Sequence, residues 1–296
     1  MTFLLDLCYF LFENSSLPQS IAMKHNITIS IGLLSGAFFL SQSNTTGQEV
    51  NQEANLFVIR YIDVEDHNQD AFVKEVTKKN KKFNRSEGSD QWWTYRILTG
   101  VRSGQFARGF GPKSWSDLDA KKTTQTLQPT PNHEEVIYWK ENIRPLEKEI
   151  GNTEVWQNPK GLIYTGLGEI SGSQAPQTRY GFHRHWKMKP GMYKRLEAHY
   201  VKLKKVFEAN KIPVNWAIYR LVAGGDFMTY SESVFFNDWK SYGSVRIVRD
   251  LFDKVHGDGS WDSYLAEHNE IMQENATVEG EFWQYLEDLS SKKLSD

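Results

Sequence analysis

Hydrophobic and polar residues alternate along several short segments, and the segments that follow them have helical spacing. Leu56 to Val64 and Tyr180 to Met188 are rich in apolar and β-branched residues and predict strands. After each, apolar residues fall on one face of a helix, which ends near Phe83 in the first case and near Phe207 in the second. The same two elements are therefore predicted in both halves of the chain.

The next elements follow the same order in the two halves. Gln91 to Thr99 and Val214 to Val222 predict second strands, and each is followed by a turn and a third strand that complete a hairpin. Further helical stretches and a last strand follow in both halves. Each half therefore has the order β-α-β-β-α-β, which is the split βαβ arrangement of the ferredoxin-like fold.

A repeated motif supports internal duplication. Both Trp92 to Gly100 and Trp216 to Gly224 have the pattern W-x-x-Y-R-x-x-x-G, and the second copy begins 124 residues after the first. The same shift places Arg60 on Arg184. A shift of 119 residues aligns the segments that begin at Gly161 and Gly280, and these predict the last strand of each half. Self-similarity at a fixed spacing indicates one structural unit used twice.

Such a sheet has helices on one face only, so its other face must be covered. The simplest cover is the sheet of the other copy. We therefore predict an α+β fold in which two tandem ferredoxin-like (βαββαβ) modules pack sheet to sheet as a pseudo-dimeric α/β barrel. The modules span residues 56–171 and 179–291, with a linker at 172–178 and a tail at 292–296.

The duplicated order of elements resembles the dimeric α/β-barrel superfamily. That superfamily includes antibiotic-biosynthesis-type monooxygenases, haem-degrading monooxygenases, NIPSNAP-like proteins and chlorite-dismutase-like haem proteins. The resemblance implies a cavity between the two sheets, and some members of the class need no cofactor. It supplies no catalytic signature that can be transferred residue by residue, and one fold hosts many chemistries.

The N-terminal segment predicts export. A short basic start at Met23, the apolar run from Ile27 to Leu40 and small residues up to Ser43 are typical of a secretory signal peptide, residues 23–43. The apolar run is short for a membrane span, which needs about 20 residues. We expect a periplasmic or secreted protein after cleavage near Ser43. Residues 1–22 then form an upstream extension, and residues 44–55 form a polar leader.

Composition narrows the classes of partner. A net charge of −2 gives no reason to expect nucleic acid as a partner, and 39% hydrophobic residues can form a sizeable core. The single cysteine, Cys8, lies before the predicted cleavage point, so the mature protein would have no thiol for a disulfide or a metal site. Duplication supplies both halves of a barrel in one chain, so we expect a monomer, with a homodimer as the alternative.

His183 and His185 are the sharpest candidates for chemistry. They are two residues apart on a predicted strand, so both side chains face the same way. The shift of 124 residues aligns them with Ile59 and Tyr61, so histidines occur in one copy only. Two such imidazoles are half of a metal site, and the pair is a candidate for metal or haem binding or for catalysis. The alternative is a pair of hydrogen-bonded interior histidines, and the sequence requires no cofactor.

A second candidate set combines mid-strand arginines with tryptophans of the repeated motif. Guanidinium groups bind carboxylates through two hydrogen bonds, so these residues are candidates for holding an acidic or aromatic ligand. The alternative is internal pairing with glutamates such as Glu232 or Glu281, and packing of the tryptophans in the core. The set comprises Arg60, Arg96, Arg184, Arg220, Trp92 and Trp216.

Three functions remain open from the sequence. The first is an exported protein that binds a small acidic or aromatic ligand between its sheets. The second is a monooxygenase-like or haem-dependent oxidoreductase that uses the same cavity. The third is an interaction protein with a filled core. A polar pocket would favour the first, a pocket that contains both histidines the second, and a filled interior the third.

Overall fold

The computed structural model describes residues 55–85, 91–118, 133–149, 151–167, 178–274 and 278–291. The predicted upstream extension, the signal peptide, the polar leader before Asn55, the linker before Thr178 and the C-terminal tail lie outside these ranges. Within them, no helix combines the length and the apolar character that crossing a bilayer requires.

Both halves of the described chain contain long strands joined by helices. The strands of the first half are β1 (Leu56–Ile62), β2 (Trp93–Ile97), β3 (Phe106–Lys113), β4 (Thr153–Gln157) and β5 (Ile163–Thr165), and its helices are α2 (Gln69–Phe83) and α3 (His133–Tyr138). The strands of the second half are β6 (Tyr180–Lys187), β7 (Asn215–Ala223), β8 (Thr229–Phe236) and β9 (Glu279–Tyr285), and its helices are α4 (Tyr193–Asn210), α5 (Trp239–Gly243), α6 (Val248–His256) and α7 (Ser260–Ile271).

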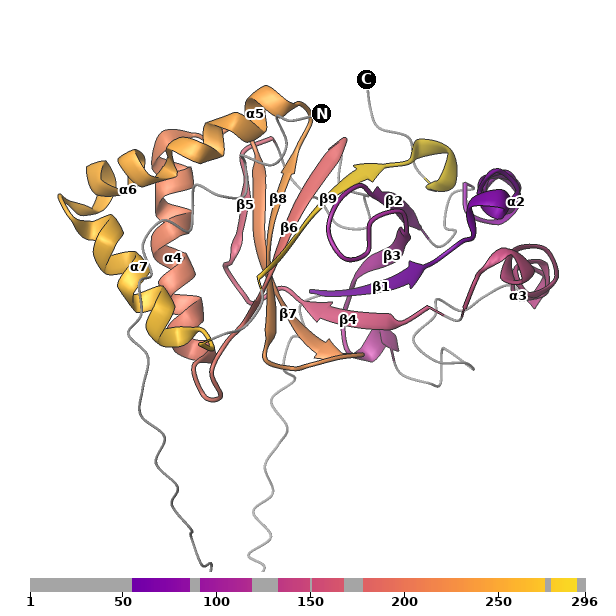
Figure 1. Cartoon of the computed structure of the whole chain (residues 1–296), viewed down its shortest axis with the longest axis horizontal. Helices are drawn as coiled ribbons and strands as arrows, with labels where there is room; N and C mark the ends of the chain where they lie inside the picture. The colour runs from indigo at the N-terminus through magenta and orange to yellow at the C-terminus, as the bar shows by residue number, and fades with distance from the viewer. Residues whose placement is uncertain are drawn as a thin grey trace, which may run out of the picture. The chain divides into compact units, whose positions relative to one another are not determined.

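The strands form one antiparallel sheet that closes on itself. Its order is β4-β1-β3-β2-β9-β6-β8-β7, and β7 pairs back to β4, so these eight strands make a closed barrel. The short strand β5 pairs with β7 and lies outside the ring. In Figure 1 the strands occupy the centre, with α4 to α7 on one side and α2 and α3 on the other.

The predicted packing of two sheets face to face is wrong. The halves join edge to edge instead, through the pairs β2–β9 and β4–β7. The edge strands of an open sheet leave backbone N–H and C=O groups without partners, and barrel closure satisfies them. The inner faces therefore surround one interior, and they do not form the two sides of a sandwich.

The end of the first half also differs from the prediction. The helical stretch expected before the last strand is instead α3, a π-helical turn over Trp139–Ile143 and a 3₁₀ turn over Arg144–Leu146. The strand of the first half that pairs with β7 and so closes the barrel is β4. The segment after Gly161 supplies only the short strand β5. Thus β4, and not the segment aligned by the shift of 119 residues, occupies the place in the first half that β9 occupies in the second.

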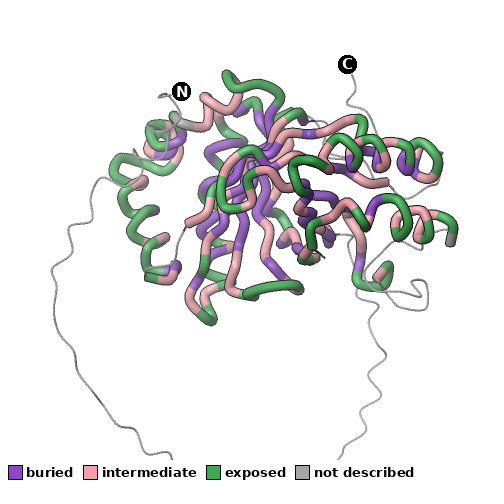
Figure 2. Tube along the Cα trace, turned by 45° about the vertical axis from the view of Figure 1, so that its right-hand side comes forward, coloured by how far each residue is buried: buried purple, intermediate pink, exposed green. Residues whose placement is uncertain are grey.

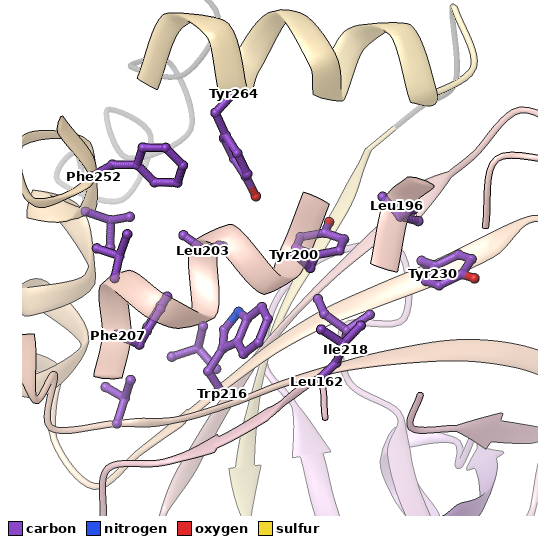
Figure 3. Close-up of a cluster of buried hydrophobic side chains, with 14 of the residues drawn as sticks. Leu162, Leu196, Tyr200, Leu203, Phe207, Trp216, Ile218, Tyr230, Phe252 and Tyr264 are labelled. Atoms are coloured by element: carbon purple, nitrogen blue, oxygen red, sulfur yellow. The ribbon is translucent and has the colours of Figure 1, made fainter. Parts of the chain in front are cut away.

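Both faces of the barrel strands are buried. The outer face of β6 to β9 packs against α4, α6 and α7 in the largest hydrophobic cluster, where Tyr200 and Phe207 of α4 contact Trp216 of β7 (Figure 3). The outer face of β1 and β3 packs against α2 through Phe72 and Phe106. Figure 2 shows buried residues concentrated along the central strands and exposed residues along the helices.

Closure at β7 depends on a glycine. Gly224 has a φ of +91°, and a Cβ atom there would lie 2.1 Å from the backbone oxygen of Thr153, the first residue of β4. We expect Gly224→Ala to lower the free energy of unfolding by about 2–3 kcal/mol, because it combines a left-handed backbone with a clash against main chain. Urea denaturation measures the change.

Gly191→Ala is the matched control for this substitution. Gly191 also has a positive φ, +81°, but nothing lies within 4 Å of a Cβ atom built there. The Gly191→Ala variant should therefore lose only the free energy that the left-handed backbone costs. Equal losses in the two variants would mean that the contact between the turn and β4 contributes nothing.

Candidate functional site

The barrel encloses a cavity. The volume that the centre of a water molecule can occupy inside it is about 70 Å³. One water needs about 10–15 Å³ by this measure, so the cavity has room for several water molecules. The walls are mostly aromatic rings, interrupted by two histidines and two serines. The lining residues are Phe57, Ile59, Tyr61, Trp93, Tyr95, Gly111, Pro112, Trp156, His183, His185, Tyr219, Ser231, Ser233, Phe235 and Trp283.

The two halves contribute unequally to this lining. Strand β1 presents Phe57, Ile59 and Tyr61 to the interior, whereas the matching positions of β6 are Gly181 and two histidines, His183 and His185. The second half therefore replaces bulky side chains by smaller and more polar ones. This difference makes the interior polar on the side formed by β6 and β8.

His183 is held by its neighbour on β8. Its Nδ1 lies 2.9 Å from Ser233 Oγ, and its ring lies 3.9 Å, centroid to centroid, from the Trp283 ring. Its Nε2 is buried and has no hydrogen-bond partner among the described residues. Gly181 leaves the space beside that atom open, since a Cβ at Gly181 would lie 2.8 Å from Nε2. Burial, with smaller effects of His185 and Arg102, holds the pKa of His183 well below its usual value, so the imidazole is neutral.

His185 faces a charged group that enters from the loop between β2 and β3. Arg102 Nη2 lies 3.1 Å from His185 Nε2 and 2.9 Å from Glu281 Oε2. Arg102 Nε donates to the other carboxylate oxygen of Glu281 at 2.9 Å, and the guanidinium lies 3.7 Å over the ring of Tyr61. Burial, followed by the charge of Arg102, lowers the pKa of His185 to about 4.

A short motif shared by β4 and β9 brings two carboxylates to this region. Glu154 and Trp156 in β4 match Glu281 and Trp283 in β9, each within the pattern E-x-W-Q. In both copies the indole N–H donates to the glutamate two residues earlier, at 2.9 Å. Burial raises the pKa of Glu154, and Arg102 opposes that rise.

Arg102, Glu154 and Glu281 were not selected as site residues from the sequence, where Glu281 was only a candidate partner for the arginines. The E-x-W-Q pattern was a signal for the two glutamates. Its copies are 127 residues apart, so neither the shift of 124 nor that of 119 aligns them.

The four candidate arginines do not line the cavity. Each faces outward from the barrel, towards the covering helices or a neighbouring strand. The hydrogen bonds they donate are Arg60 to Glu147 at 2.6 Å, Arg184 to Glu232 at 2.6 Å, Arg96 to Gln69 at 2.9 Å and Arg220 to Gln157 at 2.9 Å.

The two candidate tryptophans also lie on the outer side. The ring of Trp216 packs on Phe207 at 5.6 Å, and its indole donates to Glu232 at 3.1 Å. The ring of Trp92 packs on Phe110 at 4.9 Å. Of the eight residues selected from the sequence, the structure thus brings only His183 and His185 together in the cavity.

The cavity does not fit haem or a chelated metal ion. A volume of about 70 Å³ is well below the roughly 300–1,000 Å³ of pockets that enclose drug-sized ligands, and haem is larger still. An eight-stranded barrel has room for at most one small ligand among its side chains. Among the described residues, no cluster of three or more histidine, cysteine, aspartate or glutamate side chains could hold a metal ion.

Sequence comparison matches no protein-family model and no curated protein. Comparison of folds finds a candidate monooxygenase from Fusobacterium nucleatum with a TM-score of 0.51 at 13% identity, covering 82% of this chain and 100% of that one. A candidate monooxygenase from Lactobacillus acidophilus has a TM-score of 0.49 at 11% identity, with 81% and 97% covered. A chlorite dismutase variant from Candidatus Nitrospira defluvii has a TM-score of 0.45 at 10% identity, with 80% and 94% covered.

At these identities the likeness concerns the fold alone. The neighbours are dimeric α/β-barrel proteins of the monooxygenase-like and chlorite-dismutase-like kinds. The chain described above therefore shares its fold with the Fusobacterium nucleatum protein, and its own eight-stranded barrel closes within a single polypeptide.

Proposed function

We propose that this protein binds a small neutral molecule inside its barrel. The observation that carries the proposal is the cavity itself, in which the buried Nε2 of His183 has no partner among the described residues. Buried polar atoms are nearly always hydrogen-bonded, so an unpaired one beside an open volume indicates a site for water or a ligand. A filled interior, as expected of a purely structural core, would leave no such volume.

The lining defines the character of the ligand. It contains no arginine or lysine, and Arg102, which contacts the lining residue His185, is neutralised by Glu281. An acidic ligand would meet no free positive charge there, so we narrow the expected class to uncharged molecules. Aromatic walls favour an apolar body, and the volume limits it to about one ring.

A monooxygenase-like oxidoreductase is the second candidate. It is supported by the fold neighbour described above and by the presence of both histidines in one cavity. Because the imidazole of His183 is neutral and its Nε2 has no partner among the described residues, it could accept a hydrogen bond from the hydroxyl group of a bound substrate. We retain export, based on residues 23–43, and a monomeric state, based on closure of the barrel within one chain, as parts of the proposal.

Filling the cavity should abolish binding. Ser231 lines it and is buried, so Ser231→Leu places a branched side chain in the space a ligand would use. We expect phenol and cyclopentanone to bind the unaltered protein and not this variant, and 1-naphthol to bind neither, because two fused rings exceed the volume. Chemical-shift changes of the Trp93 and Trp283 indole N–H groups report binding.

Ser263→Leu, on the exposed face of α7, is the control and should bind like the unaltered protein. Equal binding to the Ser231 and Ser263 variants would refute the barrel site. Dioxygen consumption with the bound phenol, lost in His183→Phe, would favour the oxidoreductase. Binding without turnover would favour the binding protein.

A further inference from the structure

The side chain of Arg102 contacts His185, one of the residues that line the cavity. The loop that carries it joins β2 to β3 and contains Gly100 and Gly104, both with a φ of +90°. The guanidinium makes two hydrogen bonds to Glu281, whose side chain is fully buried, and its carbon lies 3.7 Å from the centre of the Tyr61 ring. These contacts fix the position of the group that faces His185 Nε2.

This contact determines where the proton of His185 resides. A guanidinium carries only donors, so His185 Nε2, 3.1 Å from Arg102 Nη2, must be the acceptor. A neutral imidazole with an unprotonated Nε2 carries its proton on Nδ1. Arg102 therefore selects one tautomer, and the Nδ1–H of His185 is a donor whose orientation is fixed.

That donor has no acceptor in the described protein. No hydrogen bond joins His185 Nδ1 to any described residue, although the side chain lines the cavity and is 9% exposed. His183 differs in this respect, because Ser233 can either donate to its Nδ1 or accept from it, and Ser231 lies 3.2 Å from Ser233. Of these two histidines, therefore, only His185 has a ring nitrogen that must accept and another that must donate.

The charges nearby disfavour an anion as the partner of this donor. Among the described side chains that contact one another here, Arg102 is a cation, while Glu281 and the half-buried Glu154 are two acids. An anionic oxygen would therefore meet no excess of positive charge. A neutral acceptor with a strong dipole suits the position better, and a carbonyl oxygen attached to a small apolar body matches both the donor and the aromatic walls.

We propose that the barrel selects small neutral carbonyl compounds, an aldehyde or a ketone, whose oxygen accepts a hydrogen bond from His185 Nδ1. His185 is the specificity-determining residue, and Arg102 and Glu281 are positioning residues that hold its tautomer. This inference rests on the proposed binding function and adds the chemical class of the ligand to it.

The first test needs no ligand. Nitrogen-15 chemical shifts of the imidazole at pH 7.5 should show His185 with a protonated Nδ1 and an unprotonated Nε2. Arg102→Met should convert it to a mixture of tautomers. Arg220→Met is the matched control, because Arg220 pairs with Gln157 outside the cavity, and it should leave the shifts unchanged. An Nε2–H tautomer in the unaltered protein would overturn the proposal.

The second test compares two molecules of nearly the same shape. Cyclopentanone carries a carbonyl oxygen where methylenecyclopentane carries a CH₂ group. We expect the ketone to bind at least about tenfold more tightly, as one buried hydrogen bond allows, and His185→Phe to reduce this ratio to about one. The shifts of the Trp93 and Trp283 indole N–H groups provide the binding curves.

The outcomes separate the two proposals. If both molecules bind the unaltered protein equally, the ligand site stands and selection by His185 is refuted. If neither binds, the proposed binding function fails, and the ligand class fails with it. A ratio that survives in His185→Phe would assign the selection to another group in the cavity and would also refute the inference.

Discussion

Replacing Glu232 by leucine is expected to lower the free energy of unfolding by about 3 kcal/mol. Glu232 is buried on the outer face of β8, where it accepts hydrogen bonds from Arg184 at 2.6 Å and from the indole of Trp216 at 3.1 Å. Burial opposes its ionisation, but Arg184 and Trp216 hold the pKa of Glu232 below its usual value. Removing it leaves Arg184 without its partner, which typically costs 3–5 kcal/mol.

The lower end of that range applies, because the Arg184 side chain remains 28% exposed and water can reach it. Guanidinium chloride denaturation measures the loss. The double variant Glu232→Leu/Arg184→Met should recover most of it, since no unpaired charge then remains. As a control, Glu270→Gln breaks an ion pair to Arg195 on the surface, where solvent screening should make the effect much smaller. A similar loss in both single variants would contradict the explanation.

The repeated motif and the order of the first elements in each half could be predicted because they depend on side chains. Tyr95 and Tyr219, which are equivalent in the repeated motif, both line the cavity, and their arginine neighbours Arg96 and Arg220 both face outward. Strand alternation likewise placed His183 and His185 on one face. The motif repeated at a shift of 124 residues therefore repeats in the structure, whereas the segments aligned by the shift of 119 residues do not.

Barrel closure could not be predicted in the same way. Whether two sheets meet face to face or edge to edge depends on backbone hydrogen bonds at β2–β9 and β4–β7. Almost any residue can form such bonds, so the sequence gives little sign of them. For the same reason the inner face could not be told from the outer one. Both are buried, so Arg60 and Arg184 on the outer face had the same expected pattern as residues of an interior site.

The contacts that Arg102 makes beside the cavity were the least predictable part of the site. Arg102 lies in a loop, and its contacts with Glu281 and His185 join positions that are 179 and 83 residues apart in the chain. No pattern of neighbouring residues in the sequence predicts contacts between positions so far apart. The E-x-W-Q motif could have identified Glu154 and Glu281, but it could not have shown that a single arginine lies close to both.

Three buried histidines and the half-buried His268 make acid the condition to which this fold should be most sensitive. Burial is the main cause that lowers the pKa of His185 and of His268 to about 4, and it also lowers the pKa of His183 and His199. His268 lies on α7 and is half-buried, with its ring 4.6 Å from that of Trp186. In the unfolded chain an imidazole has a pKa of about 6.5, so each of these groups binds a proton more readily when the protein unfolds.

The sign follows from this difference. Between pH 6.5 and pH 4 the unfolded chain binds more protons than the folded one, so the free energy of unfolding falls as the pH falls. A shift from about 6.5 to about 4 corresponds to about 3 kcal/mol for each of His185 and His268. Burial raises the pKa of Glu147 and of Glu154, and this offsets part of the loss.

We therefore expect the protein to lose about 6 kcal/mol of stability between pH 7 and pH 4 from these two histidines alone, measured by urea denaturation at several pH values. His185→Phe and His268→Phe should each reduce the slope of stability against pH, and the double variant should reduce it by the sum, because the two sites lie on opposite faces of β6. A slope that is unchanged in the double variant would show that other groups control the response to acid.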